Sequence, residues 1–499
     1  MATVWEKIQA SYKAALEAWR ASPTDRVKSL PLDDLRPEER DRAAKYELLW
    51  RYYGGQFKRP LKVTPGKPDD NVLINHCRRI VDKGVSFLMG QEVEFQLAEG
   101  QKTADEKALD EVWKDNHKMS LLHDVALNGG VCGTYHIQIM PDKERASGVR
   151  LVNLYPGMVF PEWNPNDVDD VWVYQLRWRS EDGKVKRTIW TLREDGKTWE
   201  FFEEVMSGRG RWVKEGASGI WEYSWCPIIS GKNLPNPNNF FGLSDLEDAD
   251  LNDAVNFVAS NMNRITRLYG HPVPWGFGFS QKELSVEPGK AVLTNNEKAN
   301  LQYLQMTSDM GNSLGLLQRY TTDFYKTARV PEMDPSLMTL GAQSGFALRV
   351  LYGDLIEKTT TKQLLYGDAL VELNRRILDF RGKGDDKIVT VHWKDPLPPD
   401  ERSEIAALQF DMQAELCSKE TASEKRGYDF ETENTRLEEE QQGKLNLGEA
   451  LLTGFNQGKN LGIPQKAPAQ AAPAIPPEAQ APAAMQAAGV GTLSAAAAE

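Results

Sequence analysis

The chain has 499 residues, enough for roughly two to four domains, and its 40% hydrophobic and 26% charged residues are typical of a soluble protein. Its formal net charge of −12 argues against a protein that coats nucleic acid, because such binding rests on many Lys and Arg contacts to phosphates. The charge does not exclude a protein through which nucleic acid moves, since an acidic or neutral wall would not hold a polyanion. Acidity is also common among soluble proteins, which is the simpler explanation.

The cysteines and histidines predict neither disulfides nor a metal site. Cys77, Cys132, Cys226 and Cys417 lie far apart without a CxxC pair, which indicates free thiols in a reducing compartment. There is no HExxH motif and no close His/Cys cluster, so we expect no zinc and no cofactor. The start, MATVWEKIQASYKAALEAW, predicts a charged amphipathic helix rather than a signal peptide, and no apolar run is long enough to span a membrane.

The first third of the chain predicts mainly helices, from apolar residues at helical spacing and from proline breaks. In chain order the predicted elements are helix over 1–53 with a break near Pro23, Pro31 and Pro37, helix over 71–90 ending at Gly90, a short strand EVEFQL, and two helical pieces over 103–128.

From residue 133 to about 230 the apolar residues alternate, which predicts a β-rich layer of meandering strands. Two EDGK stretches, 181–184 and 194–197, are flanked by strand patterns, and Asp-Gly in this position predicts a hairpin. The layer is rich in tryptophan, which is compatible with a sugar-binding face but is more typical of a core or a subunit interface. These tryptophans are Trp163, Trp172, Trp178, Trp190, Trp199, Trp212, Trp221 and Trp225.

The second half predicts two long helices that flank a small insert. Ser244 followed by Glu247 fits a capping box, which would begin a first helix with one apolar stripe. Residues 271–306 are punctuated by Pro and Gly and contain short strand-like pieces, and 308–328 predicts the second helix. The two helices with the insert between their far ends would form a stalk with a tip.

A longer helical pattern follows, from Ser344 to Phe380, in which Gly353, Gly367 and the run Thr359–Thr361 predict a bend. After it come a strand in KIVTVHWKDPLPPD, two or three short polar helices over 400–443, and a tail beyond Pro464 whose Ala, Pro and Gln predict disorder.

The chemistry of common enzymes is missing from the sequence. DGKT (195–198) has Thr191 where a phosphate-binding loop needs glycine, and no GxSxG motif is present. The paired carboxylates Asp169–Asp170 and Asp385–Asp386 lie in polar, turn-like stretches, which favours solvated surface. We therefore expect a protein that is not an enzyme.

Four stretches, in order, resemble the portal proteins of tailed bacteriophages, especially the siphophage type. NHCRRIVDKGVSFLMGQEVEF is similar to an early wing motif of that family, and FGLSDLEDADLNDAVNFVAS resembles its entry into the first stem helix. QSGFALRVLYGDLIEKTTTKQ resembles the start of the long wing helix, and VTVHWKDPLPPDERSEIAALQ with ELCSKETASEKRGYDFETENTRLEEEQ resembles the C-terminal pattern. The resemblance covers roughly residues 40–445.

This resemblance implies an α+β portal fold that assembles as a ring, of twelve subunits in virions, at one vertex of the capsid. The implied parts are an N-terminal helical arm (1–24), a wing (25–243, β-rich over 133–230), stem helix 1 (244–269), a small α/β clip (270–307), stem helix 2 (308–329), a tunnel loop (330–344), a long kinked wing helix with a strand (345–399), a helical crown (400–445) and a tail (446–499).

The segment 330–344 lies between two helices and carries methionines and leucines, which is unusual for a loop. As a tunnel loop it would form the narrowest ring of the channel, where compliant apolar side chains contact moving DNA without strong phosphate bonds. The alternative is that these side chains pack under a helix of the same subunit. The expected loop residues are Glu332, Met333, Asp334, Ser336, Leu337, Met338, Thr339 and Leu340, with Lys326 and Arg329 lining the stem and Trp275, Phe277, Phe279, Lys282 and Glu283 on the clip.

The resemblance implies partners rather than catalysis. They are further copies of the chain, the terminase large subunit that supplies the energy of packaging, the head–tail adaptor, the major capsid and scaffolding proteins, and double-stranded DNA without sequence specificity, with no membrane. The protein would assemble in the host cytoplasm and reside in the virion. Two other interpretations remain: a carbohydrate-active hydrolase that uses the tryptophan layer and needs two carboxylates across a cleft, and another head–tail connector ring protein of a phage.

Overall fold

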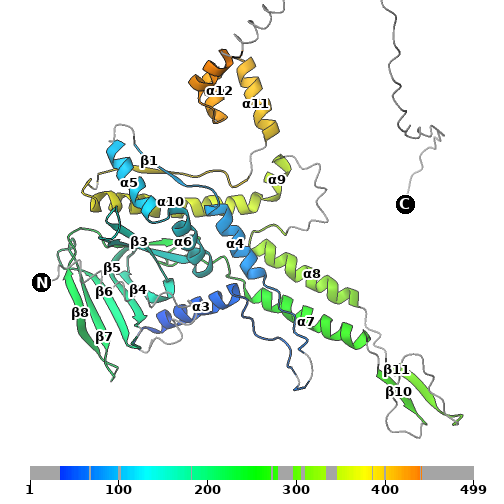
Figure 1. Cartoon of the computed structure of the whole chain (residues 1–499). Coiled ribbons are helices and arrows are strands. Elements are labelled where there is room, and N and C mark those ends of the chain that lie inside the picture. The colour runs from blue at the N-terminus through cyan, green and yellow to red at the C-terminus, as the bar shows by residue number, and fades with distance from the viewer. Residues whose placement is uncertain are drawn as a thin grey trace, which may run out of the picture. The chain divides into compact units, whose positions relative to one another are not determined.

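The computed structural model describes residues 34–63, 65–66, 69–98, 103–180, 182–208, 210–270, 273–278, 296–304, 310–332, 345–384, 386–397, 401–438 and 440. The chain divides into two compact units, Met1–Glu404 and Ile405–Glu499. The first unit mixes helices and sheets (Figure 1), in agreement with the predicted α+β class.

Amphipathic helices make up a large share of the first unit, and α4 carries most of its apolar residues on its buried side. In chain order the helices are α3 (Pro37–Tyr53), α4 (His76–Met89), α5 (Thr103–Asp115), α6 (Lys118–Cys132), α7 (Asp250–Gly270), α8 (Met310–Thr327), α9 (Gly345–Leu351) and α10 (Gly353–Phe380), with a short 3-10 helix η1 (Pro156–Met158).

The strands form antiparallel sheets, as the alternating pattern predicts. A five-stranded meander has the order β4 (Val159–Asn164), β5 (Asp167–Arg179), β6 (Val185–Leu192), β7 (Trp199–Met206), β8 (Trp212–Ile220). A three-stranded sheet has the order β3 (Val149–Leu154), β2 (Thr134–Pro141), β9 (Ile228–Lys232), and two pairs join β1 (Glu94–Leu97) to β12 (Val389–His392) and β10 (Val273–Phe277) to β11 (Asn300–Leu304).

Both Asp-Gly turns are hairpins, as predicted. Gly183 and Gly196 have φ of 78° and 66°, a region that favours glycine because other residues meet a steric cost there. Each glycine closes its turn by donating a backbone hydrogen bond three residues back, to Ser180 and Arg193. The turns therefore fix the register of β5 with β6 and of β6 with β7.

Tryptophans of the β layer fill the core rather than line an open face. The ring of Trp190 packs edge-on against Trp221, with 5.5 Å between centroids, and at 4.9 Å from Phe201. Trp172 is exposed over 42% of its surface, and Trp163 and Trp212 are half-buried. This packing does not support a sugar-binding face, and the buried members of the set are Trp178, Trp190, Trp199, Trp221 and Trp225.

Helix α10 crosses the first unit and packs against α4, α5 and β9 (Figure 1). Its inner side holds the neighbouring elements by stacking and by hydrogen bonds. Tyr366 stacks on Tyr135 of β2 with ring centroids 4.3 Å apart, and Asn374 accepts a 2.8 Å hydrogen bond from the indole of Trp113 on α5. The helix thus ties the sheet to the helices around it.

The long helical pattern breaks near its start. The break is at Tyr352, between α9 and α10, next to Gly353, one of the positions at which a bend was predicted. Gly367 and the run Thr359–Thr361 lie inside α10, which is continuous from Gly353 to Phe380. The three threonine hydroxyls each donate to the carbonyl four residues earlier, which lets them remain within the helix.

The first long helix of the pair begins later than the capping box predicts. Ser244 and Glu247 do make the expected bond, from the backbone N–H of Ser244 to Oε1 at 2.9 Å, but α7 starts only at Asp250. The reason is that this turn is drawn to the end of α6, where the Ser244 hydroxyl donates to Val131 O and Asp245 N–H donates to Gly130 O. The motif therefore caps a turn instead of the helix.

Helices α7 and α8 lie side by side (Figure 1). The helix predicted over 71–90 begins only at His76, as α4, so the prediction is wrong for residues 71–75. The segment from residue 70 to the start of α4 is extended because side chains of α7 bind its backbone groups. Asn252 accepts from His76 N–H at 3.0 Å and donates to Ile74 O at 2.9 Å. Three more side chains of α7 continue this ladder of hydrogen bonds. Asn256 accepts from Ile74 N–H, Ser260 accepts from Val72 N–H and donates to Val72 O, and Asn263 donates to Asp70 O.

Replacing Asn252 by Ala should lower the free energy of unfolding by about 2–4 kcal/mol, because two backbone groups of the segment lose their partners in a buried place. Urea unfolding followed by tryptophan fluorescence measures the change. Asn261→Ala, on the same helix and only partly buried, is the matched control and should change stability by less than about 0.5 kcal/mol. Equal effects of the two changes would show that the hydrogen bonds between α7 and residues 70–76 contribute nothing to the free energy of unfolding.

The second unit contains α11 (Glu401–Gln413), which crosses the boundary at Ile405, α12 (Lys419–Lys425), and a further helical stretch over residues 430–438. This agrees with the predicted short polar helices. Its apolar side chains Phe410, Leu416 and Leu437 are exposed, and Ala422 is buried. The predicted helical arm (1–24) and disordered tail lie outside the described residues.

Candidate functional site

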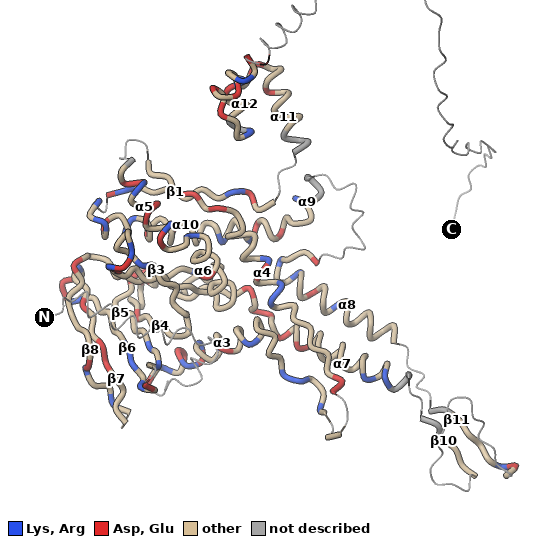
Figure 2. Tube along the Cα trace, viewed as in Figure 1, with Lys and Arg blue, Asp and Glu red and all other residues tan. Residues whose placement is uncertain are grey.

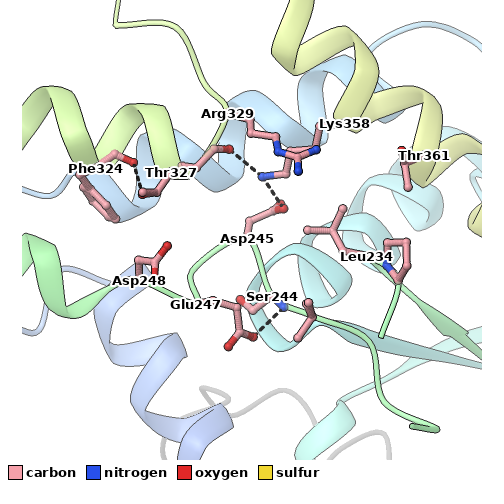
Figure 3. A pocket seen from close by; sticks show the side chains of 13 residues that line it. Leu234, Ser244, Asp245, Glu247, Asp248, Phe324, Thr327, Arg329, Lys358 and Thr361 are labelled. Carbon is pink, nitrogen blue, oxygen red and sulfur yellow. Dashed lines mark hydrogen bonds and ion pairs between the residues drawn. The ribbon is translucent and has the colours of Figure 1, made fainter. Parts of the chain in front are cut away.

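The end of α8 leads into the segment that the sequence singles out, and a cavity of about 390 Å³ opens beside this end. Figure 3 shows that α8, α10 and the turn before α7 contribute its walls. The cavity is lined by Leu234, Pro235, Leu243, Ser244, Asp245, Glu247, Asp248, Phe324, Thr327, Ala328, Arg329, Lys358 and Thr361.

The C-terminus of α8 is closed by a left-handed residue. Arg329 has φ of 56°, which brings the N–H of Val330 to the carbonyl of Tyr325 at 3.0 Å. This is the six-to-one bond of a Schellman motif, a role usually taken by glycine. The helix therefore ends at Thr327, before Pro331, and the chain leaves it in a fixed direction.

A buried ion cluster holds this end in place. Lys358 of α10 donates to the carbonyl of Ala328 at 2.9 Å and pairs with Asp245 at 2.9 Å. Lys362, one helical turn further along, pairs with the other carboxylate oxygen of Asp245 at 2.6 Å. Asn233 adds a hydrogen bond to the same carboxylate. The cluster thus joins the end of α8, the long helix α10 and the turn that precedes α7.

The cluster contains two cations and one anion, and the pKa values reflect this imbalance. Burial alone would raise the pKa of Asp245, but the charges of Lys358 and Lys362 outweigh it and lower that pKa to about 2. Burial lowers the pKa of Lys362 to about 8, because Asp245 offsets part of the cost while the charge of Lys358 adds to it. The carboxylate is therefore the group on which both lysines depend.

Helix α4 contacts the same end of α8 from another side. The imidazole Nδ1 of His76 lies 3.0 Å from the hydroxyl of Tyr325, and the two rings form a T-shaped, edge-to-face contact with centroids 5.5 Å apart. The Arg79 guanidinium lies over the Tyr325 ring, 5.6 Å from its centroid. The base of the segment is thus held by α4 as well as by α10.

The arrangement provides charge and packing rather than a reactive centre. Among the described residues no three His, Cys, Asp or Glu side chains are grouped to hold a metal ion. In the same part of the chain, no helix combines the length and apolar character needed to cross a bilayer. What the site does is fix the end of α8, shortly before residue 333.

Part of the predicted tunnel loop and stem is visible at this site. Glu332 is exposed and accepts a 3.1 Å hydrogen bond from the Thr322 hydroxyl of α8. Lys326 and Arg329 are also exposed, next to the cavity end of α8. The other predicted loop residues, Met333, Asp334, Ser336, Leu337, Met338, Thr339 and Leu340, lie outside the described residues.

The predicted clip residues are described in part. Trp275 and Phe277 lie on the same face of β10, with ring centroids 6.1 Å apart and exposed fractions of 54% and 53%. Two exposed aromatic rings on a short hairpin suit a contact surface. Phe279, Lys282 and Glu283 lie outside the described residues.

The ion cluster is not among the sites predicted from the sequence, although one signal for it is present. Lys358 and Lys362 occur four residues apart among Leu355, Thr359 and Tyr366, which are on the apolar stripe of the long helix. A lysine at an apolar position needs a buried anion, because an unpaired charge is costly there. The partner Asp245 is more than a hundred residues away and could not be identified from the helix alone.

Comparison with known proteins gives a match to one protein family over most of the chain. A family model described as "Phage portal protein, SPP1 Gp6-like" matches residues 32–445. No curated protein matches the chain.

Solved structures with weak similarity come from gene transfer agent (GTA) particles. The neck of an empty GTA particle, computed with C6 symmetry, has a TM-score of 0.44 at 11% identity and covers 70% of this chain and 90% of that chain. The virion of a native particle gives 0.42 at 12% identity, covering 77% and 93%, and the neck of a native particle computed with C12 symmetry gives 0.40 at 12%, covering 70% and 89%. Because these scores are below 0.5, identification rests on the family match. That match spans most of the sequence, and the chain belongs to the SPP1 Gp6-like family of phage portal proteins.

Proposed function

We propose that this portal protein, a component of the virion's portal vertex, forms a ring of twelve subunits with a central channel for double-stranded DNA. The observation that supports the proposal most directly is the buried ion cluster of Asp245, Lys358 and Lys362, in a chain of the portal family. This cluster anchors the end of α8, shortly before residue 333. A segment that touches moving DNA needs a fixed base. Lys358 of α10 provides one by bonding Ala328 at the end of α8 and pairing with Asp245, which also pairs with Lys362.

In this proposal α7 and α8 are the stem and the β10–β11 pair belongs to the clip. Residues 330–344 are the tunnel loop, which the resemblance assigns to the narrowest part of the channel. The elements up to β9, together with α9, α10 and β12, are the wing, and α11 and α12 belong to the crown. The exposed Lys326 and Arg329 are the stem positions assigned to the channel wall.

The partners follow from the same assignment. The terminase large subunit, which supplies the chemical energy, docks on the clip during packaging, and the head–tail adaptor replaces it afterwards. Trp275 and Phe277 are the described clip residues that such a contact would cover. Major capsid and scaffolding proteins surround the ring, and DNA passes through without sequence recognition.

Native mass spectrometry and negative-stain imaging of the purified protein test the proposal. We expect closed rings of about a dozen subunits with an axial opening wide enough for duplex DNA, since a heterologous contact whose rotation closes generates a ring. Co-expression with the capsid and scaffolding proteins of the same phage is the control for rings that close only during assembly. A monomer under both conditions would contradict the proposal.

A further inference from the structure

The outward face of α4 is positively charged and carries an open hollow of about 410 Å³. Arg78 is 3.5 Å from Asp82, but Arg79 and Lys83 have no carboxylate partner among the described residues. Instead, Lys83 Nζ lies 5.1 Å from the centroid of the Tyr352 ring, as Arg79 lies over Tyr325. The hollow is lined by Asn75, Arg78, Arg79, Asp82, Lys83 and Ser86. Figure 2 marks the basic residues of the chain, those of α4 included, in blue and the acidic residues in red.

The outward face of α10 has the opposite charge. Asp354, Glu357, Thr361, Leu364 and Asp368 follow each other at intervals of three and four residues, which places them on one stripe of the helix. In the part of the chain that the structure describes, none of the three carboxylates has a cationic partner. Leu364, in this stripe, has 67% of its surface exposed, an unusual position for a leucine in a folded unit.

The two faces point away from each other within one subunit. Helices α4 and α10 meet where Gly84 faces the Lys362 ammonium, and a Cβ on Gly84 would lie 3.5 Å from Nζ. At 3.6 residues per turn, Arg79 is rotated by about 140° from Gly84, and Leu364 by about 160° from Lys362. One subunit therefore presents a cationic face on one side of this contact and an acidic face on the other.

We propose that the cationic face of α4 in one subunit docks on the acidic stripe of α10 in the next copy of the chain. The inference rests on the ring of the proposed function and names the surfaces that close it. Two different, complementary patches facing apart are what a heterologous contact requires, and repetition of that contact generates a ring. Leu364 enters the hollow between Arg79 and Lys83, and the carboxylates on either side of it pair with the cations, which fixes the register of the contact.

Charge reversal tests the contact from both sides. One variant carries Arg79→Glu and Lys83→Glu, and the other carries Glu357→Lys and Asp368→Lys. We expect each variant alone to lose the rings that the wild type forms in native mass spectrometry, with unchanged circular dichroism. Lys107→Glu with Lys114→Glu, at exposed positions of α5, is the matched control and should leave the rings intact.

Mixing the two variants gives the decisive result. In a mixed ring, each reversed α4 face meets a reversed α10 face and each unchanged face meets an unchanged one, so we expect rings with the variants in a 1:1 ratio. Rings of each variant alone, or no rings in the mixture, would overturn the contact while the wild-type ring stands. A wild type that forms no ring would overturn both the contact and the proposed function.

Discussion

Replacing Asp245 by Asn should lower the free energy of unfolding by about 3–5 kcal/mol, because it leaves Lys358 and Lys362 buried without an anion. The amide can still accept a hydrogen bond, but it carries no charge to balance two ammonium groups. Urea unfolding monitored by tryptophan fluorescence measures the loss. Asp248→Asn, in the same turn but exposed, is the matched control and should stay within about 0.5 kcal/mol of the wild type.

Lys362→Met should have a much smaller effect than the change at Asp245. It removes the excess positive charge and leaves Lys358 paired with Asp245, and methionine fills a similar volume. We expect a change in unfolding free energy within about 1 kcal/mol, and a gain is compatible with the cost of burying an unbalanced charge. A loss as large as that of the Asp245 variant would show that Lys362 is required for the fold in its own right.

Deleting residues 333–341 should leave ring assembly intact and abolish most DNA packaging. The deletion removes the proposed tunnel loop, while the anchor formed by Ala328, Lys358 and Asp245 lies outside it. Ring formation is measured by native mass spectrometry, and packaging by nuclease-protected DNA in particles assembled with the variant. The two readouts separate a role toward DNA from a role in assembly.

A variant of equal length controls for the shortened connection. Replacing the apolar residues within 333–341 by serine keeps all nine residues of the segment and removes its flexible apolar side chains. We expect rings of normal size and a packaging defect of the same kind. Rings that fail to form in either variant would assign the segment to the subunit structure instead, as the alternative interpretation of its leucines requires.

Local patterns predicted the elements of this fold well, and long-range contacts explain the failures. The EDGK turns predicted both hairpins because Asp-Gly specifies the turn conformation by itself. Ser244 and Glu247 failed as a helix start because their turn bonds to the end of α6, which is distant in sequence. The partner of Lys358 could not be identified from the helical pattern, since Asp245 comes from another part of the chain.

The same distinction applies to the candidate site. Trp275 and Phe277 could be selected because they lie in the insert between two predicted helices. Lys326 and Arg329 could be selected because they lie at the end of the second of these helices. Their roles came from the family resemblance, and they stay predictions. The anchor at Asp245 and the cationic face of α4 could not be found this way, because both depend on which helices pack together.

The ladder of hydrogen bonds between α7 and residues 70–76 joins two backbone repeats of nearly equal length. Four residues of helix rise about 6.0 Å, while two residues of extended chain span about 6.6 Å. Asn252, Asn256 and Ser260 follow the first spacing and their partners follow the second, so each rung adds a mismatch of about 0.6 Å. At Asp70 the short side chain of Asn263 still reaches the backbone carbonyl at 2.9 Å, and Arg264 and Arg267 add ion pairs to the carboxylate. A helix can thus serve as the neighbour of an extended segment over several residues, because four residues of helix nearly match two residues of extended chain.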